Sequence, residues 1–189
     1  MREWVKWVSG ATAADRVSRA AAFACPRSAV LSGVRRTSGS CPHQPPLPMP
    51  DIEEAIRIAV EAHRGQKDRA GAPYILHPLR MLFRVQTDAE RMAAVLHDVV
   101  EDTPWTLDGL RARGFPADVV DAVDHLSRRA DESYEQFVER AAAHPVARRV
   151  KIADLEDNLD VRRIGSVAEG DAERLNRYLR AWRRLTSGE

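Results

Sequence analysis

Residues 94–103 carry the sequence Ala-Val-Leu-His97-Asp98-Val-Val-Glu101-Asp102-Thr, in which ionisable side chains interrupt an apolar run. The flanking valines and leucine favour a helix packed against a core, so His97 and Asp98 are expected beside that core. Burial of an ionised aspartate next to a histidine is costly unless something compensates. A divalent metal compensates, because both groups become its ligands. The stretch therefore predicts a metal site in an apolar setting.

Helical spacing adds two acidic side chains to this stretch. Residues four apart lie one turn apart, which pairs His97 with Glu101 and Asp98 with Asp102. An acidic pair alone is common on a solvated surface, whereas a His-Asp pair inside Val-Leu-His-Asp-Val-Val is not. Glu101 and Asp102 are candidates to orient a water molecule and accept its proton.

Two further segments offer ligands of the same kind. His77 stands between an apolar run and Pro78, and Asp154 lies in the apolar segment Val150–Leu155. Taken singly, each has an ordinary explanation as a cap or as a half-exposed helix residue. Together, His77, His97, Asp98 and Asp154 give two imidazoles and two carboxylates. That mixture suits Mn²⁺, Fe²⁺ or Zn²⁺, with positions left for water and a phosphate oxygen.

The rest of residues 51–189 predicts an all-α fold, because no sustained alternation of apolar and polar residues occurs. Capping boxes are expected at Asp51, Thr87 and Ser133. Pro78, Pro116 and Pro145 each suit the first turn of a helix. The expected helices span residues 51–64, 78–86, 87–103, 106–113, 116–128, 133–143, 145–160 and 170–185.

The composition excludes several classes of protein. The chain has 189 residues and a net charge of +1, and it contains no apolar run long enough to span a membrane. Both cysteines, Cys25 and Cys41, precede residue 51. A disulfide scaffold, a thiol nucleophile and a cysteine-ligated zinc site are therefore excluded from residues 51–189. We expect no nucleic-acid partner, because this part is net negative and lacks a basic, aromatic surface.

Residues 1–50 differ in character from the rest. They hold seven basic and two acidic residues, a net +5, which leaves −4 for residues 51–189. Six of the 11 prolines also lie there, and we expect a basic, Pro/Ser/Arg-rich extension with little packed structure. Two explanations stay open. Either Met49 is the natural start, or the extension is an organelle transit peptide. A cytoplasmic location is the main expectation.

The motif set resembles that of the HD-domain metal phosphohydrolases. Residues 62–78 (AHRGQKDRAGAPYILHP), 95–107 (VLHDVVEDTPWTL) and 150–158 (VKIADLEDN) are more specifically similar to the hydrolase domain of RelA/SpoT-type proteins. The free-standing form of that domain is the small alarmone hydrolase, represented in animals by the metazoan SpoT homologue. The similarity runs from about residue 51 to residue 185.

The resemblance implies an HD-domain fold of about eight short helices around a metal site. It implies metal ligands, usually for Mn²⁺, at His77, His97, Asp98 and Asp154. It also implies a catalytic pair at Glu101 and Asp102, and substrate contacts at Arg69 and Asn158. The implied reaction removes the 3′-pyrophosphate of (p)ppGpp and leaves GDP or GTP. Lys67, Lys151 and Arg162 lie near these motifs and are candidates to bind the remaining phosphates.

Two positions depart from the family pattern. Asp68 and Asp160 stand where the family commonly has arginine, which removes positive charge from the expected nucleotide pocket. An aspartate at residue 68 cannot form a cation–π contact with a purine and would repel phosphate. The substrate class therefore stays open among a guanine alarmone, an adenine alarmone, a less charged nucleotide and another phosphate ester.

Two other functions are consistent with the same motifs. One is an HD-type nucleotidase that releases phosphate, and the other is a nucleotide-binding module without turnover, although a sensor has no need of Glu101 and Asp102. We expect His63 to be structural and assign no role to His125 or His144. The sequence leaves the oligomeric state open.

Overall fold

The computed structural model describes residues 49–163 and 168–187 of the chain, with the exception of the side chain of Glu169. The expectations for the extension, including its two explanations, fall on residues 1–48 and so lie outside the described residues. No helix in the described part is long and apolar enough to cross a membrane.

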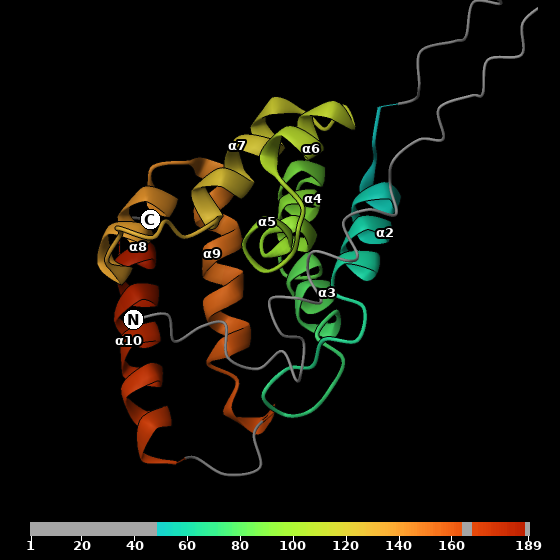
Figure 1. Cartoon of the computed structure of the whole chain (residues 1–189). Helices are drawn as coiled ribbons and strands as arrows, with labels where there is room; N and C mark the ends of the chain where they lie inside the picture. Colours follow the sequence, from blue (N-terminus) through green and yellow to red (C-terminus); the bar gives the residue numbers. More distant parts are fainter. Residues whose placement is uncertain (1–48, 164–167, 188–189) are drawn as a thin grey trace, which may run out of the picture. The chain divides into compact units, whose positions relative to one another are not determined.

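The described residues form a helical fold without strands, as the sequence predicts (Figure 1). In chain order the elements are α2 (Ile52–Ala62), α3 (Leu76–Leu82), α4 (Asp88–Leu96), α5 (Val99–Asp102), α6 (Leu107–Ala112), α7 (Ala117–Leu126), α8 (Tyr134–Ala142), α9 (Pro145–Asn158), the 3₁₀ helix η2 (Val161–Arg163) and α10 (Glu169–Thr186).

The predicted helix starts at Asp51, Thr87 and Ser133 are confirmed. Thr87 and Ser133 each form the reciprocal capping box that was expected. At Asp51 only half of the expected box forms: the Asp51 side chain accepts from the Glu54 amide, but the Glu54 carboxylate binds Arg57 and Arg113 instead. The predicted start at Pro78 is wrong, because α3 begins at Leu76. The backbone amides in the first turn of a helix have no partner within the helix, so a proline, which lacks the amide hydrogen, is tolerated there. The helix can therefore begin before Pro78. His77 consequently lies within α3.

The single helix predicted over residues 87–103 is interrupted. α4 ends at Leu96 and α5 begins at Val99, so His97 and Asp98 occupy the break. The Nδ1 atom of His97 bonds the carbonyl of Ala94 at 2.8 Å, which is the carbonyl that the residue 98 amide would use in a continuous helix. The break therefore arises at the residues that carry the predicted chemistry.

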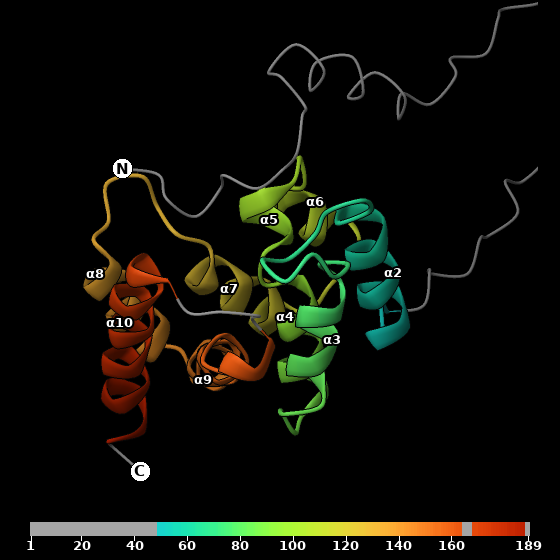
Figure 2. The same cartoon turned by 90° about the horizontal axis from the view of Figure 1, so that it is seen from below.

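Two apolar clusters surround α9. The larger one joins α2, α3, α4, α6, α7 and α9, and includes the fully buried Ile58, Leu96 and Val150. The smaller one joins α8, α9 and α10 through residues such as Phe137 and Leu155. Both views show α9 between α10 on one side and α3 and α4 on the other (Figures 1 and 2). This position explains why polar side chains of α9 are buried.

Candidate metal centre and active-site pocket

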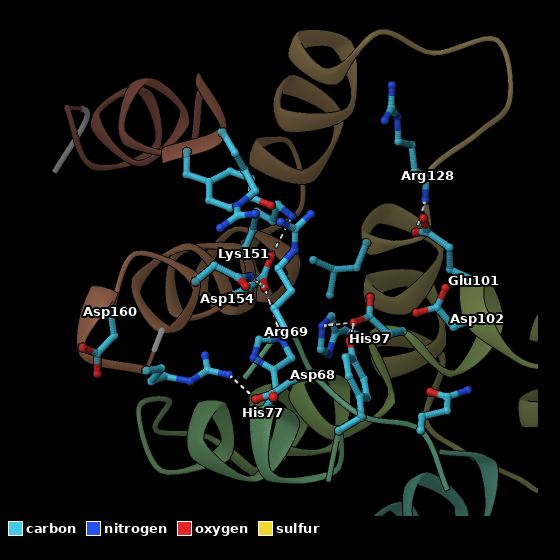
Figure 3. A pocket seen from close by; sticks show the side chains of 18 of the residues that line it. Asp68, Arg69, His77, His97, Glu101, Asp102, Arg128, Lys151, Asp154 and Asp160 are labelled. Atoms are coloured by element: carbon cyan, nitrogen blue, oxygen red, sulfur yellow. Dashed lines mark hydrogen bonds and ion pairs between the residues drawn. The ribbon is translucent and has the colours of Figure 1, made fainter. Parts of the chain in front are cut away.

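Three of the four predicted metal ligands converge at one point (Figure 3). His77 comes from α3, His97 from the break after α4, and Asp154 from α9, and all three are buried. One ligand atom from each residue lies within 4.8 Å of the others. Segments far apart in the chain thus supply the two imidazoles and the carboxylate that the motifs predict.

Hydrogen bonds orient both imidazoles toward this point. Nδ1 of His77 lies 2.7 Å from Oδ2 of Asp157, and Nδ1 of His97 lies 2.8 Å from the Ala94 carbonyl. Since each acceptor holds a proton on Nδ1, each Nε2 is left as the metal-binding atom. Nε2 of His97 is buried and has no hydrogen-bond partner among the described residues. A buried, unpartnered nitrogen of this kind fits a divalent cation bound there.

The fourth predicted ligand, Asp98, lies beside this group. Its Oδ2 is 2.8 Å from Nε2 of His97, in a contact that is not aligned as a hydrogen bond. The same oxygen accepts a hydrogen bond from the Tyr74 hydroxyl, which comes from the segment between α2 and α3. Its role as a ligand stays a prediction, and Tyr74 is the residue that holds its carboxylate.

Charge around His77 favours a cation. Burial lowers the pKa of His77, but hydrogen bonds to Asp154 and Asp157 outweigh this effect and raise the pKa to about 9. Nε2 of His77 lies 3.3 Å from Oδ1 of Asp154. The protein therefore stabilises positive charge between these two atoms, and a divalent metal supplies that charge without a proton.

Lys151 and Asn158, both predicted to bind substrate, hold the carboxylate of Asp154. Lys151 Nζ donates to Oδ2 at 2.7 Å, and Asn158 Nδ2 donates to Oδ1 at 2.6 Å. Burial lowers the pKa of Lys151, but the charge of Asp154 raises it by more, so the net pKa is raised and the ammonium stays protonated. Both residues also line the pocket, so their expected contact with substrate stays a prediction.

Asp157 contacts the candidate metal centre, and the sequence reasoning missed it. Its side chain is wholly buried, and besides His77 it binds the Arg80 guanidinium through contacts of 2.7 and 2.9 Å. Burial raises the pKa of Asp157, but hydrogen bonds from His77 and Arg80 lower it well below its usual range. Its spacing of three residues from Asp154 on one helix was the available signal. A carboxylate behind a ligating histidine fixes the ring and increases its basicity.

The predicted catalytic pair lies in α5, at the edge of the same pocket. Burial, followed by the charges of Asp98 and Glu101, raises the pKa of Asp102 to about 7. Burial also raises the pKa of Glu101, whose Oε2 accepts a hydrogen bond from the Arg128 amide at 2.9 Å. A carboxylate with a pKa near neutrality is suited to accept a proton from water.

The cavity next to these groups measures about 230 Å³. The metal-binding group lies in one part of its lining. Aromatic side chains line another part, namely Tyr134, Phe137 and Tyr178. The lining also includes the basic side chains of Lys67, Arg69, Arg128, Lys151, Arg163 and Arg174. Aromatic faces and cations together suit a nucleotide that carries several phosphates.

The structure does not bring every predicted substrate residue to this cavity. Lys67 and Arg69 line it from the segment between α2 and α3. Arg162 is not among the lining residues, and its side chain is 85% exposed and paired with Asp160. In η2 the next residue, Arg163, reaches the cavity instead. Sequence alone could not choose between these adjacent arginines, because the choice depends on how the chain turns after α9.

Asp68 and Asp160, the two aspartates at positions where arginine was expected, each have a basic partner. Arg163 Nη2 lies 2.8 Å from Oδ2 of Asp68, while Oδ1 of Asp68 accepts the amides of Ala70 and Ala72, each at 2.9 Å. Asp160 is paired with Arg162 through contacts of 2.7 and 2.8 Å. The expected repulsion of phosphate is therefore offset, since neither carboxylate is an unpaired charge.

Among the described residues, the other histidines, namely His63, His125 and His144, lie outside the pocket lining. His63 is buried, its Nδ1 lies 2.8 Å from the Gln66 side chain, and its ring packs on Tyr74. Its Nε2 is buried without a hydrogen-bond partner among the described residues, and the structural role expected for it stays a prediction. His125 and His144 pack against each other with ring centroids 5.1 Å apart.

The comparison with protein families decides the class. The HD domain family matches residues 55–175, which is more than half of the chain. The chain belongs to the HD-domain family. The helical architecture around paired histidines and aspartates is thus the HD-domain fold that the sequence predicts.

Curated relatives of this HD-domain chain are much longer proteins. It is 34% identical over 131 residues to the guanosine-3′,5′-bis(diphosphate) 3′-pyrophosphohydrolase of Haemophilus influenzae, covering 62% of this chain and 19% of that protein. It is 38% identical over 122 residues to the GTP pyrophosphokinase of Streptomyces coelicolor, covering 57% of this chain and 14% of that protein. The chain thus spans about a fifth or less of the length of these relatives.

A solved structure shares the fold over a larger part of both chains. It is described as a metazoan ortholog of SpoT that hydrolyses ppGpp. The TM-score is 0.60 at 24% identity, and the match covers 72% of this HD-domain chain and 85% of the other.

Proposed function

We propose that this HD-domain chain is a metal-dependent phosphohydrolase that removes the 3′-pyrophosphate of a (p)ppGpp-like alarmone, leaving GDP or GTP. One observation carries the proposal. Three buried potential ligands, His77, His97 and Asp154, converge beside a cavity that Glu101 and Asp102 also line. The names of the Haemophilus relative and of the matching solved structure, both concerned with ppGpp hydrolysis, support the substrate class.

The residues of the chain have distinct parts in this reaction. His77, His97 and Asp154, with Asp98 beside them, would hold a divalent cation, which would supply Lewis-acid polarisation of a phosphate oxygen and lower the pKa of a water molecule. Asp102, whose pKa is near 7, accepts the proton of the attacking water. Glu101 is held by the Arg128 amide and orients the same water. The bond from phosphorus to the ribose 3′-oxygen breaks, and that oxygen takes up a proton.

The other lining residues suit a charged purine nucleotide. Lys67 and Arg69 face the cavity from one loop, and Arg128 and Arg174 from other elements. Such guanidinium and ammonium groups bind phosphate oxygens. The rings of Tyr134 and Tyr178 offer apolar faces to a base.

Several finer points belong to the proposal alone. We propose Mn²⁺ as the metal, with Fe²⁺ and Zn²⁺ as alternatives that suit the same ligands. A small-molecule nucleotide is the proposed partner, and the absence of nucleic-acid and membrane partners stays a prediction. The cytoplasmic location is likewise a prediction.

The test is a product analysis with the full chain and Mn²⁺. Guanine and adenine alarmones and ordinary nucleotides are supplied in parallel, and pyrophosphate and orthophosphate are quantified separately. We expect pyrophosphate and an equal amount of GDP from ppGpp. Cleavage of ordinary nucleotides to orthophosphate with ppGpp left intact would support the nucleotidase instead. Binding without any turnover would support the non-catalytic module.

A further inference from the structure

Arg163 binds two carboxylates that belong to different parts of the pocket. Its Nη2 contacts Oδ2 of Asp68 at 2.8 Å, and its Nη1 contacts both the Oδ2 and the carbonyl of Asp157, the latter at 2.9 Å. Its side chain is only 23% exposed, and both partners are less exposed still. Ion pairs shielded in this way are screened less by salt than surface pairs and restrict the groups that they join.

On one side of this arginine lies the loop of residues 66–74. Asp68 organises the loop, because its Oδ1 accepts the Ala70 and Ala72 amides and its own amide donates to the Ala72 carbonyl. The loop closes where the Tyr74 amide donates to the Gln66 carbonyl. Lys67 and Arg69 flank Asp68 and line the cavity. The carboxylate of Asp68 thus holds the segment that presents these cations.

On the other side lies the metal centre. The Asp157 oxygen that Arg163 contacts is the one bonded to Nδ1 of His77. The opposite nitrogen of His77 faces Asp154 in the metal-binding group. A continuous chain of polar contacts therefore runs from His77 through Asp157 and Arg163 to Asp68.

We infer that Arg163 is a positioning residue that couples the conformation of loop 66–74 to the metal site. The inference rests on the proposed function only in that the loop is the part that would contact substrate. A cation that orders His77 and Asp157 also orders Arg163, and with it Asp68 and the loop. By linkage, a substrate that orders the loop raises the affinity for the metal by the same factor.

This arrangement gives a reason for an aspartate at residue 68. An arginine there would have no favourable contact with Arg163, since both side chains would be positive. In the observed ion pair, Arg163 of η2 supplies the cation and Asp68 of the loop supplies the anion. Asp68, which also lines the cavity, thereby connects the loop to the metal centre.

The experiment measures the loop and the metal without substrate. Backbone hydrogen exchange of residues 66–74 is recorded for the full chain with and without Mn²⁺, and Mn²⁺ affinity is measured by titration. In the unmodified chain we expect Mn²⁺ to slow exchange of the Asp68, Ala72 and Tyr74 amides by about 10-fold, a coupling within the common range.

Arg163→Gln removes the connection. We expect this variant to lose the Mn²⁺-induced protection and to bind Mn²⁺ about 10-fold more weakly, as for other partners behind a metal ligand. Arg163→Lys, which can keep one contact, should recover part of the protection. Arg162→Gln is the matched control for these two readouts, because Arg162 pairs only with Asp160 among the described residues. It should leave both unchanged.

Asp68→Asn is a second variant for the same test, to be used if Arg163→Gln does not fold. It keeps an oxygen for the Ala70 and Ala72 amides and removes the charge that faces Arg163. We expect about 5-fold weaker Mn²⁺ binding from a change made in the loop, which a merely local role would not cause.

Two results would overturn the inference. Either Mn²⁺ protects the loop equally in the unmodified chain and in Arg163→Gln, or it does not protect the loop of the unmodified chain at all. Because neither readout uses a substrate, the inference can stand if ppGpp is not hydrolysed, and it can fail while hydrolysis is found.

Discussion

The two ends of the pocket are built differently. At the metal end, His77, His97 and Asp154 are each no more than 6% exposed, and each has a defined partner behind it. At the substrate end, Arg69 is 61% exposed and contacts Asp171 at 3.4 Å. Buried ligands with fixed partners tolerate little change, whereas exposed cations can be replaced by neighbours. Under the proposed function, the chemistry is therefore set at one end and the choice of substrate at the other.

The largest effect is expected from the metal end. Asp154→Asn leaves Lys151 buried without its counter-ion and removes the charged ligand. We expect hydrolysis to fall by more than the about 100-fold attributed to partners behind a ligand. A chelator should have the same effect on the unmodified chain, with recovery on addition of Mn²⁺. Activity that survives both treatments would contradict a metal-dependent reaction.

Asp102→Asn separates chemistry from metal binding. The expected fall in kcat is about 10²- to 10⁴-fold, because a positioned general base is removed while the shape is kept. Mn²⁺ affinity, measured by titration, should change little. If kcat stays the same, Asp102 is not the base, and Glu101→Gln then decides whether its neighbour is.

Asp157→Asn tests the partner of His77. The Asn side chain can still accept from Nδ1 but carries no charge, so we expect Mn²⁺ affinity to fall by about 10-fold. Asp160→Asn serves as its control, because within the described part of the chain the Asp160 carboxylate pairs with Arg162 alone and is not bonded to His77. If both variants bind Mn²⁺ as tightly as the unmodified chain, Asp157 has no part in metal binding.

The smallest effect is expected at the substrate end. Arg69→Gln should raise KM by about 5-fold or less, since an exposed cation contributes little, and should leave kcat unchanged. The rise should shrink as salt is added. Arg91→Gln on α4, which pairs with Asp88 away from the cavity, should leave KM unchanged. A large fall in kcat for Arg69→Gln would contradict this difference between the two ends of the pocket.

The same contrast explains what could be predicted from the sequence. Helix starts such as Thr87 depend on residues three apart, so local pattern is sufficient. His77, His97 and Asp154 stand out because polar residues in apolar runs need a compensating partner. The all-α fold follows from the same apolar periodicity. These features are local in sequence even where they meet in space.

What the sequence did not predict depends on long-range geometry. Asp157 bonds a histidine 80 residues away, and Arg163 bonds an aspartate 95 residues away. The helix is broken at His97, whose side chain hydrogen-bonds the backbone carbonyl of Ala94. The orientation of Arg162 away from the cavity follows from the short turn after α9. None of these choices is determined by residue type or spacing alone.

The most direct measurement is hydrolysis of ppGpp in water enriched in ¹⁸O, with Mn²⁺ and the full chain. Attack of water on the phosphorus next to the ribose predicts one ¹⁸O atom in each released pyrophosphate and none in the GDP. Orthophosphate as the labelled product, or ¹⁸O in the nucleoside, would contradict the account.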